Sequence, residues 1–474
     1  MSPAPASGLP SKQEDAVSEF RTEKDSLGEV KVPATALWGA QTQRAIDNFP
    51  VSGQPMPAEF IVAVAQIKRA SAQANASLGL LEAGLRDAIT DACDRLIQGE
   101  HADQFPVDRY QTGSGTSTNM NVNEVIAAIA GAQGVDVHPN DHVNMSQSSN
   151  DVIPTAIHVS ALLAVKEQLL PALSHLRGVI YEREAELSTQ VKTGRTHLMD
   201  AMPVTLGQEL RTWREQLAAA EKRLEQVMDE LADVPQGGTA VGTGVNAASE
   251  FSGQFIKFLR SNTGYPFRSM EHKFVGQSAV DAPVALSAQL RGVAVVLTKI
   301  ANDLRWMNSG PIHGLAEISL PALQPGSSIM PGKVNPVIPE SVAMVGAQVM
   351  GLDNAVAIAG QSGNFQLNVM LPLVGGNLLD MIRLLTGASS ILADKAMKGF
   401  TVNAENLNAG VGRNPVLVTA LNPEIGYTLA ADIAKEAYRT GRPVIDVAEE
   451  RSGLSRQRLE KLMDPLKLTR GGLT

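Results

Sequence analysis

The chain has 474 residues, of which 44% are hydrophobic and 19% are charged, and its net charge is −9. This length predicts roughly three domains, and the acidic balance excludes a protein built to coat nucleic acid or an anionic membrane. The single cysteine excludes an intrachain disulfide and suits a reducing, cytoplasmic compartment. The N-terminal segment contains no apolar core of a secretory signal. No run approaches about 18 uninterrupted apolar residues, so no membrane-spanning helix is expected.

Composition divides the chain into four segments. Residues 1–18 are rich in Pro, Ala and Ser and are predicted to form a disordered tail. Residues 19–150 alternate helical stretches with irregular ones, which indicates a mixed, mostly helical N-terminal domain. Residues 151–400 carry long helical patterns, and residues 401–474 carry shorter ones broken by Gly and Pro. We therefore expect a central bundle of long helices followed by a small helical C-terminal domain.

The central segment contains apolar stripes in which hydrophobic residues recur at spacings of three and four. The stripes cover residues 162–180, 210–231 and 286–307, with a fourth expected around 378–392. This period places the apolar side chains on one face of each helix and favours packing at shallow angles. The sequence thus predicts a mainly α protein. Because long apolar seams usually continue into neighbouring subunits, we also expect a homo-oligomer.

Four polar stretches interrupt the helical patterns, and they are rich in hydroxyl and amide side chains. They cover residues 111–121, 138–151, 194–200 and 326–336. Neutral donors with few charges suit a small dianionic ligand, because donors fix its carboxylates and little charge is desolvated in the empty site. The alternative interpretation is that Ser, Thr, Asn and Gly merely form turns and helix caps.

Spacing excludes three familiar motifs. A phosphate-binding loop has four residues between its first Gly and Gly-Lys-Ser/Thr, whereas Gly326 and Gly332 enclose five and Val334 follows the lysine. The Gly-x-Ser-x-Gly nucleophile elbow is absent from the sequence. The glycines of residues 238–244 have the reverse order from the dinucleotide fingerprint.

The histidines give no clear metal signature. The eight histidines are scattered, and no His-Glu-x-x-His pattern occurs. His138 and His142 have the i, i+4 spacing of a helical ligand pair, but Pro139 opposes a regular helix between them. No metal site and no cofactor are expected.

Residues 326–335, Gly-Ser-Ser-Ile-Met-Pro-Gly-Lys-Val-Asn, resemble the signature of the fumarase/aspartase superfamily. Matching motifs follow the expected order at 23–30, 37–43, 111–117, 146–151, 194–197, 237–244 and 420–427. Within that superfamily the chain is most similar to class II fumarase. The resemblance implies a three-domain fold whose central helices form the core of a homotetramer, with each active site shared between three subunits. It also implies the hydration of fumarate to (S)-malate, a tricarboxylic acid cycle reaction.

The resemblance also implies roles for four side chains. Ser327 would be the base that removes the carbon-bound proton, and its alkoxide would need stabilisation by N–H groups in a closed loop. His197 would handle the leaving water, with Glu340 holding and polarising the imidazole. Lys333 would balance the charge of the dicarboxylate, and the intermediate would be an aci-carboxylate carbanion.

The remaining implied substrate contacts are mostly uncharged donors. They are Ser114, Gly115, Thr116, Ser148, Ser149, Asn150, Thr196, Ser328, Val334 and Asn335.

The family's secondary anion site would lie at His138, Pro139, Asn140 and Asp141. Fumarases often carry a basic residue shortly before this motif, where this chain has Val-Asp-Val at 135–137.

Two other functions fit the same superfamily. Aspartate ammonia-lyase is the nearest enzyme, but aspartases usually carry Ala and Thr at the positions of Ser114 and Ser149. A non-catalytic structural member is the second alternative, and the complete set of Ser327, His197, Lys333 and Glu340 argues against it. Gln366 replaces the usual Glu of the family, and this change has no physical explanation here.

Overall fold

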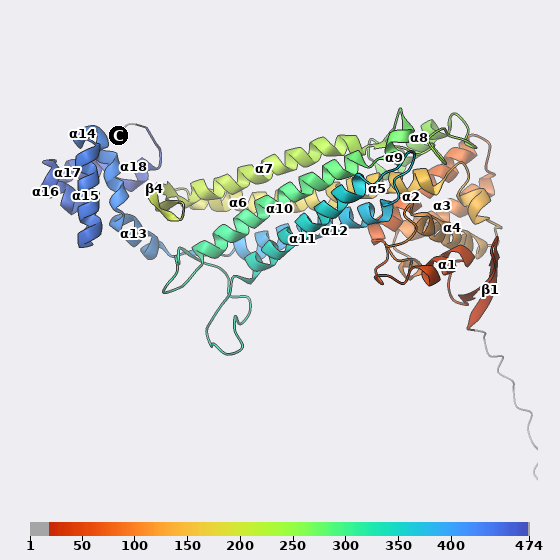
Figure 1. Ribbon diagram of the computed structural model, residues 1–474, viewed down its shortest axis with the longest axis horizontal. Helices are drawn as coiled ribbons and strands as arrows, with labels where there is room; N and C mark the ends of the chain where they lie inside the picture. The colour runs from red at the N-terminus through yellow and green to blue at the C-terminus, as the bar shows by residue number, and fades with distance from the viewer. Residues whose placement is uncertain (1–18, 473–474) are drawn as a thin grey trace, which may run out of the picture. The chain divides into compact units, whose positions relative to one another are not determined.

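The computed structural model describes residues 19–472, so the tail expected at 1–18 lies outside the described residues. The fold is mainly helical, as the sequence predicts (Figure 1). The strands of the described residues form four two-stranded sheets. The strands are β1 (Phe20–Asp25), β2 (Gly28–Pro33), β3 (Val191–Thr196), β4 (Met199–Thr205), β5 (Asp233–Val234), β6 (Arg268–Ser269), β7 (Ile318–Ser319) and β8 (Thr401–Val402). Each sheet pairs two strands that are consecutive in this numbering, and the three pairs with a resolved register are antiparallel.

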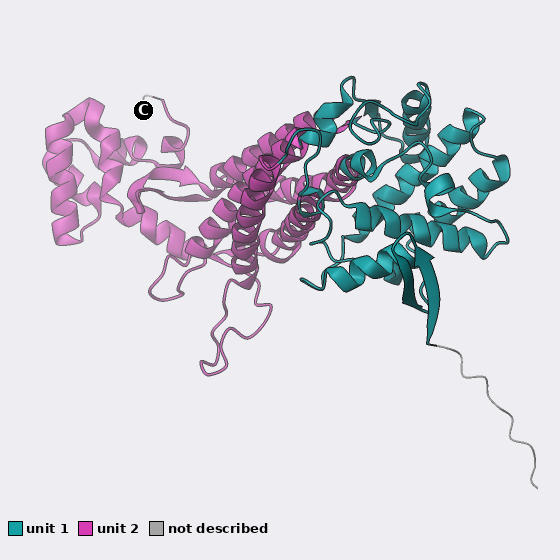
Figure 2. Cartoon of the chain, turned by 45° about the vertical axis from the view of Figure 1, so that its right-hand side comes forward, with its two compact units in different colours: residues 1–156, 234–279, 363–373 teal, residues 157–233, 280–362, 374–474 magenta. Residues whose placement is uncertain are grey.

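The chain divides into two compact units (Figure 2). Unit 1 comprises residues 1–156, 234–279 and 363–373, and unit 2 comprises residues 157–233, 280–362 and 374–474. The helices of unit 1 are α1 (Ala40–Asn48), α2 (Ala58–Ser77), α3 (Ala83–Ile97), α4 (Thr116–Gly131), α8 (Phe251–Thr263) and α9 (Lys273–Ser278), with short turns η1 (Ala102–Gln104) and η2 (Pro139–Val143). Two of the unit boundaries fall within α5 (Ser149–Ala164) and α12 (Leu371–Leu392), and one divides the short strand β5.

Unit 2 contains long helices, which are α6 (Leu170–Glu186), α7 (Leu206–Leu231), α10 (Asp281–Met307) and α11 (Val337–Gly360), with π-helical turns η3 (Val165–Leu169) and η4 (Ala393–Met397). The apolar stripes predict α6, α7 and α10, and the fourth stripe, at 378–392, falls within α12, whereas no stripe predicts α11. Helix α7 packs against α6 and α10, and α10 packs against α11. The stripe of α7 is buried as expected, since Leu210, Trp213 and Leu217 have no exposed surface. The helices therefore hold together through one continuous apolar seam.

The last part of unit 2 has its own small core. Its elements are α13 (Ala404–Arg413), η5 (Pro415–Leu421), α14 (Asn422–Ile425), α15 (Tyr427–Thr440), α16 (Val444–Ser452), α17 (Arg456–Leu462) and α18 (Pro465–Leu468). A cluster of buried side chains that includes Leu421, Ile433, Val447 and Leu459 joins these short helices. Several short amphipathic helices can thus share one apolar centre.

Three described helices are long and apolar enough to cross a membrane by length and composition alone, which corrects the expectation that none would be. They cover Ser149–Glu186, Asp281–Met307 and Val337–Gly360. Isolated polar residues interrupt each apolar run, so no uninterrupted apolar stretch in the sequence predicts these three helices. Half of the most apolar window of Asp281–Met307 is buried inside the protein, where it serves the packing between α7, α10 and α11.

Candidate active site

In unit 1, a cavity of about 440 Å³ brings together the expected donors Thr116, Ser148, Ser149 and Asn150. Ser114 does not line this cavity, but its Oγ lies 2.9 Å from Oγ1 of Thr116. Loop residues 239–246 provide part of the opposite wall. Two stretches that are about 90 residues apart in sequence therefore meet around one polar hollow.

Gly115 is required by the local backbone between Ser114 and Thr116. Its φ is +74°, in the left-handed region that favours glycine. A Cβ at this position would lie 2.8 Å from Cγ2 of Ile153 on α5. Gly115 therefore allows the start of α4 to approach α5 and brings Thr116 to the cavity.

Asp151 joins the two walls of the cavity. Its buried carboxylate accepts hydrogen bonds from the backbone N–H groups of Ser148 at 2.9 Å, Gly237 at 3.0 Å and Thr239 at 2.9 Å. Burial raises the pKa of Asp151, and these N–H donors oppose that effect. The side chain of Asn150 adds a second link, because its Nδ2 donates to the carbonyl of Ala240 at 2.8 Å.

Sequence reasoning missed the polar network beneath this cavity. Lys68 of α2 is fully buried, and its Nζ donates to Oδ1 of Asn144 at 2.9 Å and to Oε1 of Gln147 at 3.1 Å. Asn119 of α4 donates through Nδ2 to Oγ of Ser149 at 3.0 Å. Burial lowers the pKa of Lys68 to about 7, while the charge of Asp151 works in the opposite direction.

In unit 2, Thr196 and His197 lie at the exposed end of the β3–β4 hairpin. Thr196 pairs with Met199, so His197 and Leu198 form the two-residue turn. Their φ angles are +56° and +61°, the combination that a two-residue hairpin turn of this hand requires.

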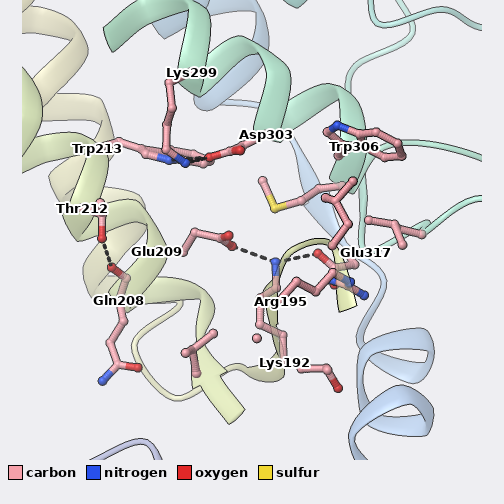
Figure 3. Close-up of a pocket in the computed structure, with 16 residues that line it drawn as sticks. Lys192, Arg195, Gln208, Glu209, Thr212, Trp213, Lys299, Asp303, Trp306 and Glu317 are labelled. Atoms are coloured by element: carbon pink, nitrogen blue, oxygen red, sulfur yellow. Dashed lines mark hydrogen bonds and ion pairs between the residues drawn. The ribbon is translucent and has the colours of Figure 1, made fainter. Parts of the chain in front are cut away.

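A buried ion-pair network holds the base of this hairpin, beside a cavity of about 410 Å³ (Figure 3). Nζ of Lys192 lies 2.7 Å from Oε2 of Glu209 and 2.6 Å from Oε2 of Glu317. Nη1 of Arg195 lies 2.5 Å from Oε1 of the same Glu317. Because the Lys192 and Glu317 side chains are only 3% exposed, solvent screens this network weakly. It anchors β3, the strand that leads into the turn at His197.

Ser327 belongs to the long loop between β7 and α11. Its Oγ accepts hydrogen bonds from the backbone N–H groups of Ile329 at 3.2 Å and Met330 at 3.0 Å. Two such donors favour the ionised form of a hydroxyl over the neutral one. Ser327 is half-buried, whereas Ser328 next to it is exposed.

Bonds across its base close this loop. The N–H of Gly326 donates to the carbonyl of Lys333 at 2.7 Å, and Nδ2 of Asn335 donates to the carbonyl of Gly326 at 2.8 Å. A Cβ at position 326 would lie 2.5 Å from the Lys333 carbonyl oxygen. Glycine is therefore needed for the two ends of the loop to approach each other. Residues 327–332 are thereby held as one closed segment.

Two hollows flank the loop. One of about 510 Å³ is lined by Lys333, Val334, Asn335 and Glu340, and the other, of about 500 Å³, by Ser327 together with Lys333 and Val334. The first hollow also contains Arg305, which sequence reasoning did not single out. Lys333 therefore faces both sides of the loop.

The structure does not join all the expected catalytic residues directly. Within residues 19–472, no hydrogen bond or ion pair links His197 to Ser327 or to Glu340. The expected site residues form three groups, which are the unit 1 donors, the hairpin turn with His197, and the loop with Ser327 and Lys333.

The expected secondary anion site lies on the π-helical turn η2. The His138 N–H donates to Nδ1 of His142 at 3.0 Å, and Nδ1 of His138 accepts from the Asp141 N–H at 3.1 Å. Asn140 and Asp141 are exposed, and Pro139 is half-buried. Among residues 19–472, no group of three His, Cys, Asp or Glu side chains has the arrangement that could hold a metal ion.

Comparison with known proteins agrees with this arrangement of motifs. Residues 28–351 match the Lyase family and residues 417–470 match the Fumarase C C-terminus family. Fumarate hydratase class II 2 of Pseudomonas aeruginosa is 58% identical over 96% of this chain and 100% of its own length. Fumarate hydratase class II of Mycobacterium tuberculosis is 48% identical over 96% of this chain and 97% of its own.

A solved structure extends this likeness to the fold. The class II fumarase from Schistosoma mansoni superposes with a TM-score of 0.92 at 37% identity, covering 95% of this chain and 99% of that one. Sequence and fold agree over nearly the whole length. The chain therefore belongs to the class II fumarate hydratase family.

Proposed function

We propose that the chain catalyses the reversible addition of water to fumarate to give (S)-malate. The observation that carries this proposal is the pair of backbone N–H groups on Ser327 Oγ, from Ile329 and Met330. Removing a proton from carbon beside a carboxylate needs a strong base. An ordinary serine hydroxyl is too weak an acid to supply the alkoxide that could act as this base. Two fixed backbone donors lower the free energy of the alkoxide.

The other roles follow from charge and placement. Ser327 takes the proton from carbon, and the electron pair moves into the adjacent carboxylate to form the aci-carboxylate. Lys333, on the same loop, supplies positive charge to the dianion, and Ser328, Val334 and Asn335 complete that side of the site. His197 protonates the departing hydroxyl, and Glu340 orients its imidazole.

The donors of unit 1 bind a carboxylate of the substrate. Ser114, Gly115, Thr116, Ser148, Ser149 and Asn150 form this set. Thr196, next to His197, is proposed as a further substrate contact. The polar hollow that contains Thr116 and Ser148–Asn150 supports this role, because hydroxyl and amide donors bind an anion without the desolvation of further charges. We propose that residues His138–Asp141 form a secondary anion site, which is separate from the active site.

We propose a homotetramer in which three subunits contribute to each site. Helix α11 supports this assembly, since Met344, Met350 and Ile358 are 68%, 38% and 49% exposed and such an apolar face is normally covered in a stable protein. We also propose a cytoplasmic location, which the single, buried cysteine favours. The three expected domains, 19–150, 151–400 and 401–474, are retained in this proposal, and the separate core of the C-terminal helices supports the last boundary.

The deciding experiment is a paired assay. The purified protein is given (S)-malate or aspartate, and the absorbance of the fumarate double bond is followed. We expect turnover of malate and none of aspartate. Turnover of aspartate alone would make the protein an aspartate ammonia-lyase, and turnover of neither would favour a non-catalytic structural member.

A further inference from the structure

We propose that Lys68, acting through Asn144 and Asn119, fixes the hydroxyl of Ser149 as a hydrogen-bond donor that faces the ligand. Lys68 is then a positioning residue for carboxylate binding. This inference deepens the proposed function and rests on the binding role given there to Ser149. All four residues belong to unit 1.

The hydrogen bonds at Asn144 have a fixed direction. Nζ of Lys68 lies 2.9 Å from the side-chain oxygen of Asn144 and donates to it, as the ammonium form, which is a donor only, requires. The other end of the same amide agrees, because Nδ2 of Asn144 donates to the carbonyl of Gln147 at 3.2 Å. The orientation of Asn144 is therefore set from both sides.

Asn119 connects the oriented Asn144 amide to Ser149. Asn119 and Asn123 of α4 also reach Oδ1 of Asn144, at 3.2 and 3.3 Å, so both must present their NH₂ groups to it. The Nδ2 of Asn119 also donates to Oγ of Ser149 at 3.0 Å. The buried side-chain oxygens of Asn119 and Asn123 find no donor among residues 19–472, yet turning the Asn119 amide over would place two oxygens against each other.

The hydroxyl hydrogen of Ser149 completes this chain of contacts. Because Ser149 Oγ already accepts from Asn119, its hydrogen must point elsewhere, and among residues 19–472 no group accepts it. Ser149 and Asn144 both line the 440 Å³ cavity of unit 1. The free O–H can therefore donate into this cavity, where a carboxylate oxygen is the strongest available acceptor. A buried lysine side chain thus determines how a neutral hydroxyl meets an anion.

A double-variant cycle tests this chain of contacts. Asn119→Ala, Ser149→Ala and the double variant are compared by calorimetric binding of succinate, a four-carbon dicarboxylate, and by the KM and kcat for fumarate. Loss of a hydrogen bond to a charged group weakens binding by about tenfold or more. We expect Asn119→Ala to weaken succinate binding about tenfold and to change KM more than kcat. In the Ser149→Ala background the same substitution should have less than about a twofold effect.

Asn121→Ala is the matched control. Asn121 lies on the same helix, is 1% exposed, and donates through Nδ2 to the carbonyl of Gln104 at 3.0 Å, outside the network. It should leave succinate binding unchanged. Ser149→Thr, which restores a hydroxyl, should restore the sensitivity to Asn119→Ala. Lys68→Met should reproduce the effect of Asn119→Ala, and if it fails to fold the Asn119 cycle still decides the question.

Independent, multiplicative effects of Asn119→Ala and Ser149→Ala would overturn the inference. An equal loss in Asn121→Ala would overturn it as well, because it would indicate a purely structural role for these amides. Unchanged succinate binding in Ser149→Ala would remove the group on which Lys68 is said to act. An inactive wild-type protein would overturn the proposed function instead, since the binding cycle is read without turnover.

Discussion

The backbone N–H of Met330 lies 3.0 Å from the Oγ of Ser327, within the loop that Gly326 and Asn335 close. The serine and its donor belong to the same short turn, so the surroundings of the proposed base do not depend on distant parts of the chain. Backbone donors placed in this way would stabilise the proposed alkoxide of Ser327. Because the donors are backbone groups, a substitution can remove only the Ser327 side chain from this arrangement.

Ser327→Ala should therefore lower turnover by about 10²–10⁴, the usual scale for loss of a general base. It should also abolish exchange of the malate methylene proton with solvent, measured by NMR in deuterium oxide. Ser390→Ala is the control, because the Ser390 hydroxyl donates only to the Thr386 carbonyl within α12. Persistent proton exchange in Ser327→Ala would contradict the assignment.

His197→Asn should reduce turnover by about 10²–10⁴, since the leaving hydroxyl then departs without a proton donor. The substrate KM should change much less, because the carboxylate donors stay in place. His175→Asn serves as the control, since His175 is exposed and pairs with Asp394 at 2.8 Å. A steady-state rate within about threefold of the wild type would remove the role given to His197.

The turn that carries His197 contains a residue that is poorly suited to it. Leu198 has a φ of +61° and is 65% exposed, and a left-handed conformation is unfavourable by about 1–2 kcal/mol for ordinary residues. Leu198→Asn should raise the free energy of unfolding by about 0.5–1 kcal/mol, because Asn tolerates this conformation. Leu198→Val should lower it, as urea unfolding can measure. Equal stability of the two variants would contradict strain at this position.

Glu317→Gln should lower the free energy of unfolding by about 3 kcal/mol, because it leaves the buried Lys192 charge and the half-buried Arg195 charge only partly paired. Turnover should fall as well, since the strand that leads to His197 loses its anchor. Glu186→Gln is the control, and its partly exposed pair with Arg183 should contribute less than about 1 kcal/mol. Similar urea unfolding midpoints for both variants would show that the network is not structurally important.

Helices with one apolar face were predictable from sequence, and others were not. The stripe at 210–231 predicts α7 (Leu206–Leu231), whose buried side matches it. Helix α11 gave no such signal, because apolar residues surround it and its exposed Met344 and Met350 blur the period. A two-sided apolar helix cannot be separated from other buried segments by periodicity alone.

The candidate site shows a similar division. Short motifs predicted which residues gather, such as Ser148–Asn150 around the unit 1 cavity. Lys68 was not predicted, because a single lysine in a helical pattern normally indicates a solvated position. Its partners lie 76 and 79 residues away in sequence. Only the packing of α2 against neighbouring elements brings the lysine to Asn144 and Gln147.

The buried His158 makes stability depend on pH. Burial lowers the pKa of His158 to about 4, from an ordinary value of 6.5, although the carbonyl of Leu231 lies 3.2 Å from its Nδ1. Between pH 4 and 6.5 the unfolded chain binds more protons at this residue than the folded chain does. The free energy of unfolding therefore rises with pH across this window.

Acidification from pH 6.5 to 4.5 should accordingly destabilise the wild type by up to roughly 1.4 kcal/mol per pH unit from this residue. His158→Gln should lose that part of the slope, which urea unfolding at several pH values can measure. Ser160→Ala, a buried non-titrating neighbour on α5, should change stability without changing the slope. A histidine that burial keeps neutral takes up its proton only when the fold opens, and this uptake produces the slope. An unchanged slope in His158→Gln would therefore mean that the acid sensitivity in this window originates at other residues.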